Sequence, residues 1–230
     1  MNEIEGIKVV SFDADGTLWD FEKVMRRSLR HALDELRKMA PDVGERLTLA
    51  ELIQIRMAVA RRLRGKMNLE EIRLEAFQQT LKHLGRPDDA LASHLNDVYL
   101  KHRFEDIELF EDVLPVLNEL KMRYDLGMLS NGNSYPEFCG LKSMFKFVVF
   151  AQDYGFEKPD PRLFNAAVDK ARCSKRELLH VGDSLQDDVA GAVGAGIRCV
   201  WLNRIGMKNA FDIRIDYEIS SLFDLLEMLE

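Results

Sequence analysis

The sequence has few cysteines and no long apolar run, and each shortage excludes a class of protein. Its 230 residues include three cysteines, Cys139, Cys173 and Cys199, which lie far apart and form no Cys-x-x-Cys pair. A disulfide framework and a zinc site are therefore not expected. No apolar stretch approaches the roughly 20 residues of a transmembrane helix, and the first residues are polar rather than signal-like. We expect a cytoplasmic protein without a membrane partner.

Internal repeats and low-complexity tracts are also missing, and the composition is that of an ordinary globular protein, with 47% hydrophobic and 31% charged residues. The net charge of −7 and the lack of interleaved aromatic and basic residues give no indication of nucleic-acid binding. Charge is unevenly distributed, since residues 21–104 contain 17 Lys and Arg against 12 Asp and Glu. This basic segment is either a solvated helical surface or a lid that attracts an anionic substrate.

Residues 21–104 have the periodicity of amphipathic helices. Apolar residues recur every three or four positions from Met25 to Met39, and Pro41 ends that run. Three further helices are expected from their N-terminal capping signals, at Thr48 with Glu51, at Asn68 with Glu71, and at Asp88 or Asp89. The segment is therefore predicted to be an all-helical bundle.

Outside that segment, short apolar runs alternate with helical stretches, which indicates an α/β fold with a parallel sheet covered on both faces. The expected strands are residues 7–12, 126–129, 147–150, 179–181 and 199–202. The helical segment is inserted after the first strand, and the sheet resumes with a helix near residues 113–121. We predict a core of residues 1–20 and 105–230 and a helical insertion of residues 21–104.

The first strand ends in two aspartates, Asp13 and Asp15, followed by Gly16. Side chains alternate along a strand, so both carboxylates are expected on the same side of the backbone, facing one cavity. Such a pair is suited to act as a nucleophile and a proton shuttle. The alternative is that the Asp-Ala-Asp-Gly segment is an ordinary turn.

Three later segments place further polar residues at strand ends, where open α/β sheets bind ligands. They are Ser130-Asn131, Lys158 before Pro159, and Gly182-Asp183 with Asp187 and Asp188 in the following turn. Each alone could be structural: a turn, a solvated lysine, or acids that favour a helix N-terminus. Together they bring four carboxylates, Asp13, Asp15, Asp183 and Asp188, towards one cavity. Such crowding requires counter-charge, which Lys158 and a Mg²⁺ ion could supply.

The order of these segments resembles the four motifs of the haloacid dehalogenase superfamily. The resemblance spans nearly the whole chain, and residues 21–104 look like the small helical cap of C1 type. It implies a Rossmann-like three-layer core with a parallel sheet and an inserted cap domain.

The resemblance also implies a role for each matching residue. Asp13 would be the nucleophile that forms an aspartyl-phosphate, and Asp15 the acid and base. Phosphoryl oxygens would be held by Ser130, Asn131 and Lys158. Magnesium would be bound by Asp13, the backbone carbonyl of Asp15, and Asp183. Asp188 would support the site, and Asp187 stands where many members have Asn, so its role stays open.

Asp15 indicates phosphate ester chemistry, because members that cleave carbon–halogen bonds typically lack an Asp at this position. The expected function is a magnesium-dependent phosphatase for a small phosphorylated metabolite, as a monomer or weak homodimer. A phosphomutase with the same chemistry and a non-catalytic interaction protein that keeps the fold are the alternatives. Candidate substrate contacts in the cap are Arg56, Arg61, Arg62 and Arg64.

Overall fold

The computed structural model describes residues 4–229, which divide into two compact units. One unit runs from the described N-terminal residues to Asp20 and resumes at Leu109, and the other comprises Phe21–Glu108. The expected limit after residue 104 lies within the last helix of the second unit, which continues to Glu105. None of the helices formed by residues 4–229 is both long enough and apolar enough to cross a membrane.

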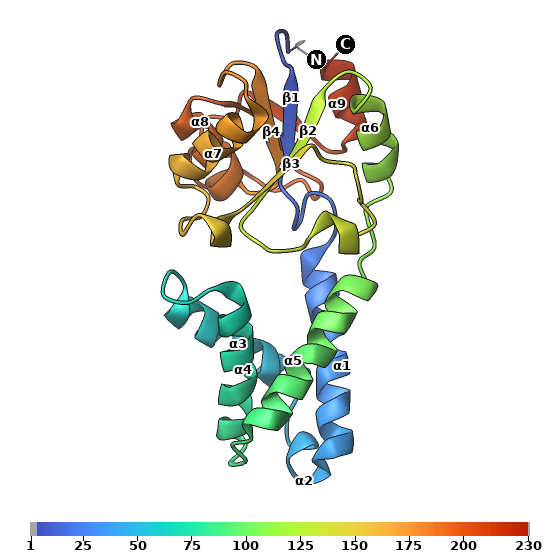
Figure 1. Cartoon of the computed structure of the whole chain (residues 1–230), viewed down its shortest axis with the longest axis vertical. Helices are drawn as coiled ribbons and strands as arrows, with labels where there is room; N and C mark the ends of the chain where they lie inside the picture. The colour runs from blue at the N-terminus through green and yellow to red at the C-terminus, as the bar shows by residue number, and fades with distance from the viewer. Residues whose placement is uncertain (1–3, 230) are drawn as a thin grey trace. The chain divides into compact units, whose positions relative to one another are not determined.

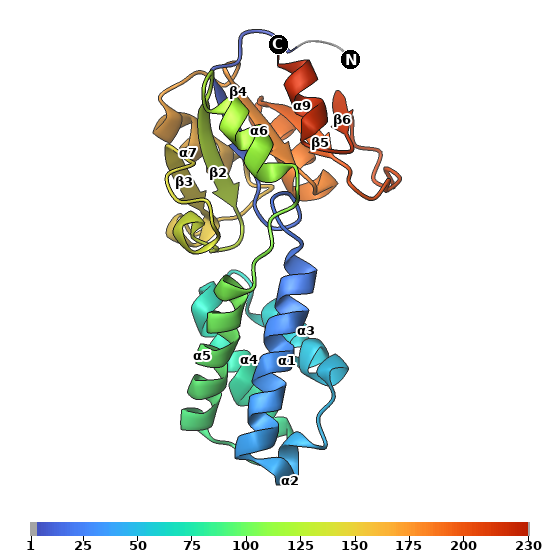
Figure 2. The same ribbon diagram turned by 90° about the vertical axis from the view of Figure 1, so that its right-hand side faces the viewer.

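The first unit is an α/β core with a parallel sheet of six strands in the order β3-β2-β1-β4-β5-β6 (Figures 1 and 2). The strands are β1 (Val9–Phe12), β2 (Asp125–Ser130), β3 (Phe147–Phe150), β4 (Leu178–Gly182), β5 (Arg198–Leu202) and β6 (Tyr217–Ile219). Five of them occur where apolar runs predicted them, and β6 was not expected.

Helices cover both faces of this sheet, which gives the predicted three layers. They are α6 (Val113–Leu120), α7 (Pro161–Ala171), α8 (Gly191–Ala195) and α9 (Phe223–Met228). Helices α7 and α8 pack on one face, and α6 and α9 on the other (Figures 1 and 2). Burial on both sides explains why β1 and β4 are apolar along almost their whole length.

The register of the sheet places the ends of its central strands at one level. Phe12, the last residue of β1, is aligned with Met128 of β2 and with Val181 of β4. Residues that follow these positions in the chain therefore emerge together at the carboxyl edge of the sheet. This is the physical reason that motifs far apart in the sequence can form one site.

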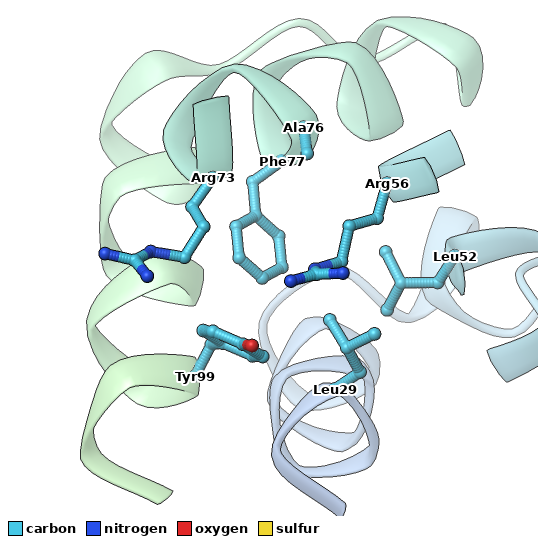
Figure 3. Close-up of a pocket in the computed structure, with 7 residues that line it drawn as sticks. All are labelled: Leu29, Leu52, Arg56, Arg73, Ala76, Phe77 and Tyr99. Carbon is cyan, nitrogen blue, oxygen red and sulfur yellow. The ribbon is translucent and has the colours of Figure 1, made fainter. Parts of the chain in front are cut away.

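The second unit is a helical bundle. Its helices are α1 (Phe21–Met39), α2 (Pro41–Gly44), α3 (Leu49–Leu63), α4 (Leu69–His83) and α5 (Asp89–Glu105). The predicted capping boxes at Thr48 and Asn68 are confirmed, and Asp88 caps α5 by accepting a 2.9 Å hydrogen bond from the Leu91 amide. Four of the helices, α1, α3, α4 and α5, contribute residues to a pocket in the bundle (Figure 3).

Candidate active site

A cavity of about 180 Å³ opens at the carboxyl edge of the sheet. It is many times larger than the about 10–15 Å³ that one water molecule requires. All eight site residues expected from the sequence line it, together with Gly132 and Ser184: Asp13, Asp15, Ser130, Asn131, Lys158, Asp183, Asp187 and Asp188. The structure thus brings the four segments together, while the chemical role of each residue stays a prediction.

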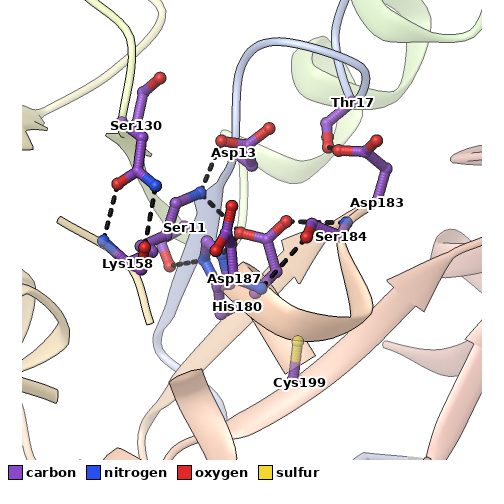
Figure 4. Close-up of polar contacts among 12 residues, drawn as sticks. Ser11, Asp13, Thr17, Ser130, Lys158, His180, Asp183, Ser184, Asp187 and Cys199 are labelled. Carbon is purple, nitrogen blue, oxygen red and sulfur yellow. Dashed lines mark hydrogen bonds and ion pairs between the residues drawn. The ribbon is translucent and has the colours of Figure 1, made fainter. Parts of the chain in front are cut away.

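Lys158 lies at the centre of the charged residues and is only 1% exposed. Its Nζ donates hydrogen bonds to Oδ1 of Asp13 at 2.6 Å and to Oδ1 of Asp188 at 2.5 Å (Figure 4). Burial alone would lower the pKa of the ammonium group, but these two carboxylates raise it above its ordinary value. Lys158 is therefore a permanent positive charge in this site.

The side chain of Asn131 holds the backbone of Lys158 from both sides. Its Oδ1 accepts a 2.7 Å hydrogen bond from the Lys158 amide, and its Nδ2 donates to the Lys158 carbonyl at 3.0 Å. From the sequence, this side chain was expected to contact phosphoryl oxygens. In the structure it fixes the backbone of Lys158, and its contact with a phosphoryl group stays a prediction.

Asp188 is anchored through both of its oxygens. Its Oδ1 accepts hydrogen bonds from Lys158 and from Nε2 of His180 at 3.0 Å, and Oδ2 accepts from the Ser184 amide at 3.0 Å. Burial opposes ionisation, but the charge of Lys158 and the hydrogen bond from His180 outweigh it and hold the pKa of Asp188 below its ordinary value. Asp188 therefore stays ionised and orients the lysine.

Two residues of this network were missed by the sequence analysis, His180 and Ser11. Both side chains are fully buried, and Ser11 Oγ lies 2.9 Å from Nδ1 of His180 (Figure 4). The network therefore runs from Ser11 through His180 and Asp188 to Lys158. Burial lowers the pKa of His180, which favours a neutral ring that donates from Nε2 to Asp188 and accepts from Ser11 at Nδ1.

Asp15 is held by a residue four positions further along the same turn. Trp19, which is completely buried, donates a 2.9 Å hydrogen bond from Nε1 to Oδ1 of Asp15. The other oxygen, Oδ2, faces Gly132, where an added Cβ would lie only 2.6 Å away. Gly132 thus provides the space that the Asp15 carboxylate occupies. Its amide also donates a 3.0 Å hydrogen bond to Oγ of Ser130.

Carboxylate oxygens of Asp13, Asp183 and Asp188 lie within 4.8 Å of one another. Burial is the largest cause that raises the pKa of Asp13 well above its ordinary value, and the charges of Asp188 and Asp183 add to it while Lys158 opposes it. Burial and the charge of Asp188 likewise raise the pKa of Asp183 to about 6. One ammonium group is thus insufficient to balance the three carboxylates.

A divalent cation fits this donor set. Asp188 accepts three hydrogen bonds, from Lys158, His180 and Ser184, whereas Asp13 and Asp183 each accept one side-chain hydrogen bond and keep more lone pairs to bind it. Mg²⁺ typically uses one or two carboxylates together with water and substrate oxygens. Gly16 keeps the space beside Asp183 open, because its φ is +96° and an added Cβ would lie 2.4 Å from Oδ2 of Asp183.

A sequence model described as haloacid dehalogenase-like hydrolase matches residues 7–196. The chain therefore belongs to this family of hydrolases, as its motifs and its α/β core with an inserted helical bundle indicated.

Individual relatives within the family catalyse different reactions. A 5-amino-6-(5-phospho-D-ribitylamino)uracil phosphatase, YigB of Escherichia coli, is 27% identical over 97% of this chain and 96% of its own. A structure of a 2-haloacid dehalogenase from Pseudomonas syringae is 32% identical, with a TM-score of 0.83 over 96% of this chain and 97% of that one. The family is thus established, and phosphatases and dehalogenases are both among the similar proteins.

A third similar protein is relevant to the question of which metal ion the site could bind. The putative hydrolase YfnB of Bacillus subtilis, whose structure was determined bound to magnesium, is 27% identical. Its TM-score is 0.76, over 98% of this chain and 100% of that one. A protein of the same fold therefore binds the ion that the carboxylates of the present site would accommodate.

Proposed function

We propose that the protein is a magnesium-dependent phosphomonoester hydrolase that acts on a small phosphorylated metabolite. The observation that carries this proposal is Asp15, a second carboxylate in the cavity that already contains Asp13 and Lys158. Hydrolysis of a phosphate ester needs a group that first gives and later takes a proton, and a carboxylate held at hydrogen-bonding distance from Trp19 is suited to this task. The phosphatases among its relatives agree with this assignment.

The first half of the reaction is phosphoryl transfer to the protein. Oδ1 of Asp13 is occupied by Lys158, and no hydrogen bond from a residue within 4–229 reaches Oδ2, which is left to attack phosphorus. The new bond joins this oxygen to phosphorus, the ester bond breaks, and Asp15 protonates the leaving oxygen. Lys158 and Ser130, which line the cavity, would hold phosphoryl oxygens.

In the second half, Asp15 takes a proton from water, whose oxygen attacks the aspartyl-phosphate. The bond between phosphorus and the Asp13 oxygen breaks, which releases inorganic phosphate, restores the Asp13 carboxylate and leaves Asp15 protonated, as it was before the first half. Bound Mg²⁺, held by Asp13 and Asp183, would neutralise negative charge on the phosphoryl group.

The test is release of phosphate from p-nitrophenyl phosphate with Mg²⁺ and with EDTA. We expect activity only with the metal, a fall of about a thousandfold or more in Asp13→Asn, and no change in the exposed control Asp169→Asn. Full activity in Asp13→Asn would exclude it as the nucleophile. Transfer that requires a bisphosphate activator would indicate a phosphomutase, chloride release from 2-chloropropionate a dehalogenase, and lack of any turnover an interaction protein.

A further inference from the structure

The helical unit contains a pocket that combines apolar walls with basic and phenolic groups. Leu29, Leu52 and Phe77 form the apolar part. The guanidinium of the half-buried Arg56 and the hydroxyl of Tyr99 point towards its centre, while Arg73 lies at its edge (Figure 3). Residues of three helices, α3, α4 and α5, thus supply all of its polar groups.

Tyr99 is the residue that most directly indicates a bound molecule. Its side chain is 1% exposed, and its hydroxyl has no hydrogen-bond partner among the described residues. Buried polar groups are almost always hydrogen-bonded, and an exception costs about 1–3 kcal/mol. A hydroxyl beside a guanidinium group is therefore placed to meet a polar group that is not part of the chain.

Charge in this region favours an anion. Arg73 and Arg103 are 8% and 3% exposed, so two positive charges are buried in the bundle beside Arg56. Burial lowers the pKa of Arg73 to about 10, and the charges of Arg103 and Arg56 lower it further, whereas Tyr99 and Glu70 oppose them. A pKa of about 10 keeps Arg73 charged at neutral pH. The guanidinium of Arg56 adds a positive charge at the pocket itself, which favours a bound negative charge there.

We propose that this pocket binds one anionic group of a small molecule, a carboxylate or a phosphate, between the guanidinium of Arg56 and the hydroxyl of Tyr99. Arginine presents a planar fork that matches both groups, and the phenol adds a third donor. The void of about 10 Å³ accepts one water molecule in the present side-chain arrangement, so the long, half-buried side chain of Arg56 must turn to admit an anion. Leu29 and Leu52 provide apolar contacts beside it.

The probes are malonate, a small dicarboxylate, and inorganic phosphate, and calorimetry measures the binding of each to the full chain. We expect about tenfold weaker binding of at least one probe in Arg56→Gln and Tyr99→Phe, and wild-type binding in Lys101→Gln, an exposed residue of the helix that carries Tyr99. This measurement needs no turnover, so it is independent of the proposed reaction.

The melting temperature of Tyr99→Phe should not fall below the wild-type value, because its hydroxyl has no partner among the described residues to lose. Weaker binding of either probe in Arg56→Gln and Tyr99→Phe supports the proposal. If both variants bind malonate and phosphate as the wild type does, the pocket holds only water and the proposal is wrong.

Discussion

The indole Nε1 of Trp19 donates a 2.9 Å hydrogen bond to Oδ1 of Asp15, only four residues earlier in the chain. The amide of Gly16 in turn donates to the Trp19 carbonyl at 2.8 Å, so the turn between them is closed by its own hydrogen bonds. This arrangement fixes one oxygen of Asp15 and leaves the other facing the cavity beside Gly132. The proposed acid and base is therefore held by local structure rather than by the metal site.

Asp15→Asn should separate the position of this group from its chemistry. The amide oxygen can still accept the Trp19 hydrogen bond, so the fold and KM should stay close to wild type. It cannot transfer a proton, so kcat should fall by about a hundredfold to ten-thousandfold, the usual contribution of general acid–base catalysis. Steady-state kinetics with p-nitrophenyl phosphate measure the effect. Wild-type kcat in this variant would show that Asp15 is not the acid and base.

Gly132→Ala should displace Asp15 without altering any titratable group. The added Cβ would lie 2.6 Å from Oδ2 of Asp15 and 3.3 Å from Oγ of Ser130, so the carboxylate has to move. We expect a fall in kcat of about tenfold or more, since small displacements of catalytic groups are costly. Gly194→Ala is the matched control, because nothing lies within 4 Å of its added Cβ. Equal activity of the two variants would contradict the assignment.

His180→Phe should weaken the support of Asp188 and Lys158. It removes the 3.0 Å hydrogen bond to Asp188 and leaves Ser11 Oγ without its ring partner, which should lower the free energy of unfolding by about 1–3 kcal/mol. We expect kcat to fall about tenfold while KM changes little, because Lys158 loses a fixed orientation. Asn or Gln at position 180 should restore part of kcat through its amide donor. Unchanged kcat in His180→Phe would leave His180 with a purely structural role.

Some residues changed in these variants were predicted from the sequence, and others were found only in the structure. Asp13, Lys158 and Asp183 were found because carboxyl ends of parallel strands meet at one edge, so position along the chain indicated position in space. Ser11 and His180 lie inside short strands that are otherwise mostly apolar, and the sequence analysis assigned them no role in the site. Their contact depends on the register of β1 against β4, which aligns the two residues. The sequence signal that could have identified them is a polar residue within an otherwise apolar, buried strand.

Other differences have similar causes. The hydrogen bonds between the Asn131 side chain and the backbone of Lys158, 27 positions later, were not expected, because no local pattern links the two residues. Strand β6 has only three residues, Tyr217–Ile219, too few to show a period. By contrast, the helices of the second unit begin near their predicted caps, because a capping box is a local interaction that neighbouring residues determine.

Asp112→Asn should change how stability depends on pH. Both oxygens of Asp112 accept hydrogen bonds from Arg204 at 2.8 and 2.9 Å, and Oδ2 also accepts from the Leu222 amide. Burial acts to raise the pKa of this carboxyl, but these hydrogen bonds outweigh it and hold the pKa below its ordinary value of 3.8. The ionised form therefore contributes its full stability above about pH 4 and loses it as the pH falls through the lowered folded-state pKa.

We expect Asp112→Asn to lower the free energy of unfolding by about 2 kcal/mol at pH 7. Between pH 5 and pH 2, the variant should lose less of its remaining free energy of unfolding than wild type does, as measured by urea unfolding at each pH. Parallel acid profiles of the two proteins would mean that Asp112 does not contribute to acid sensitivity.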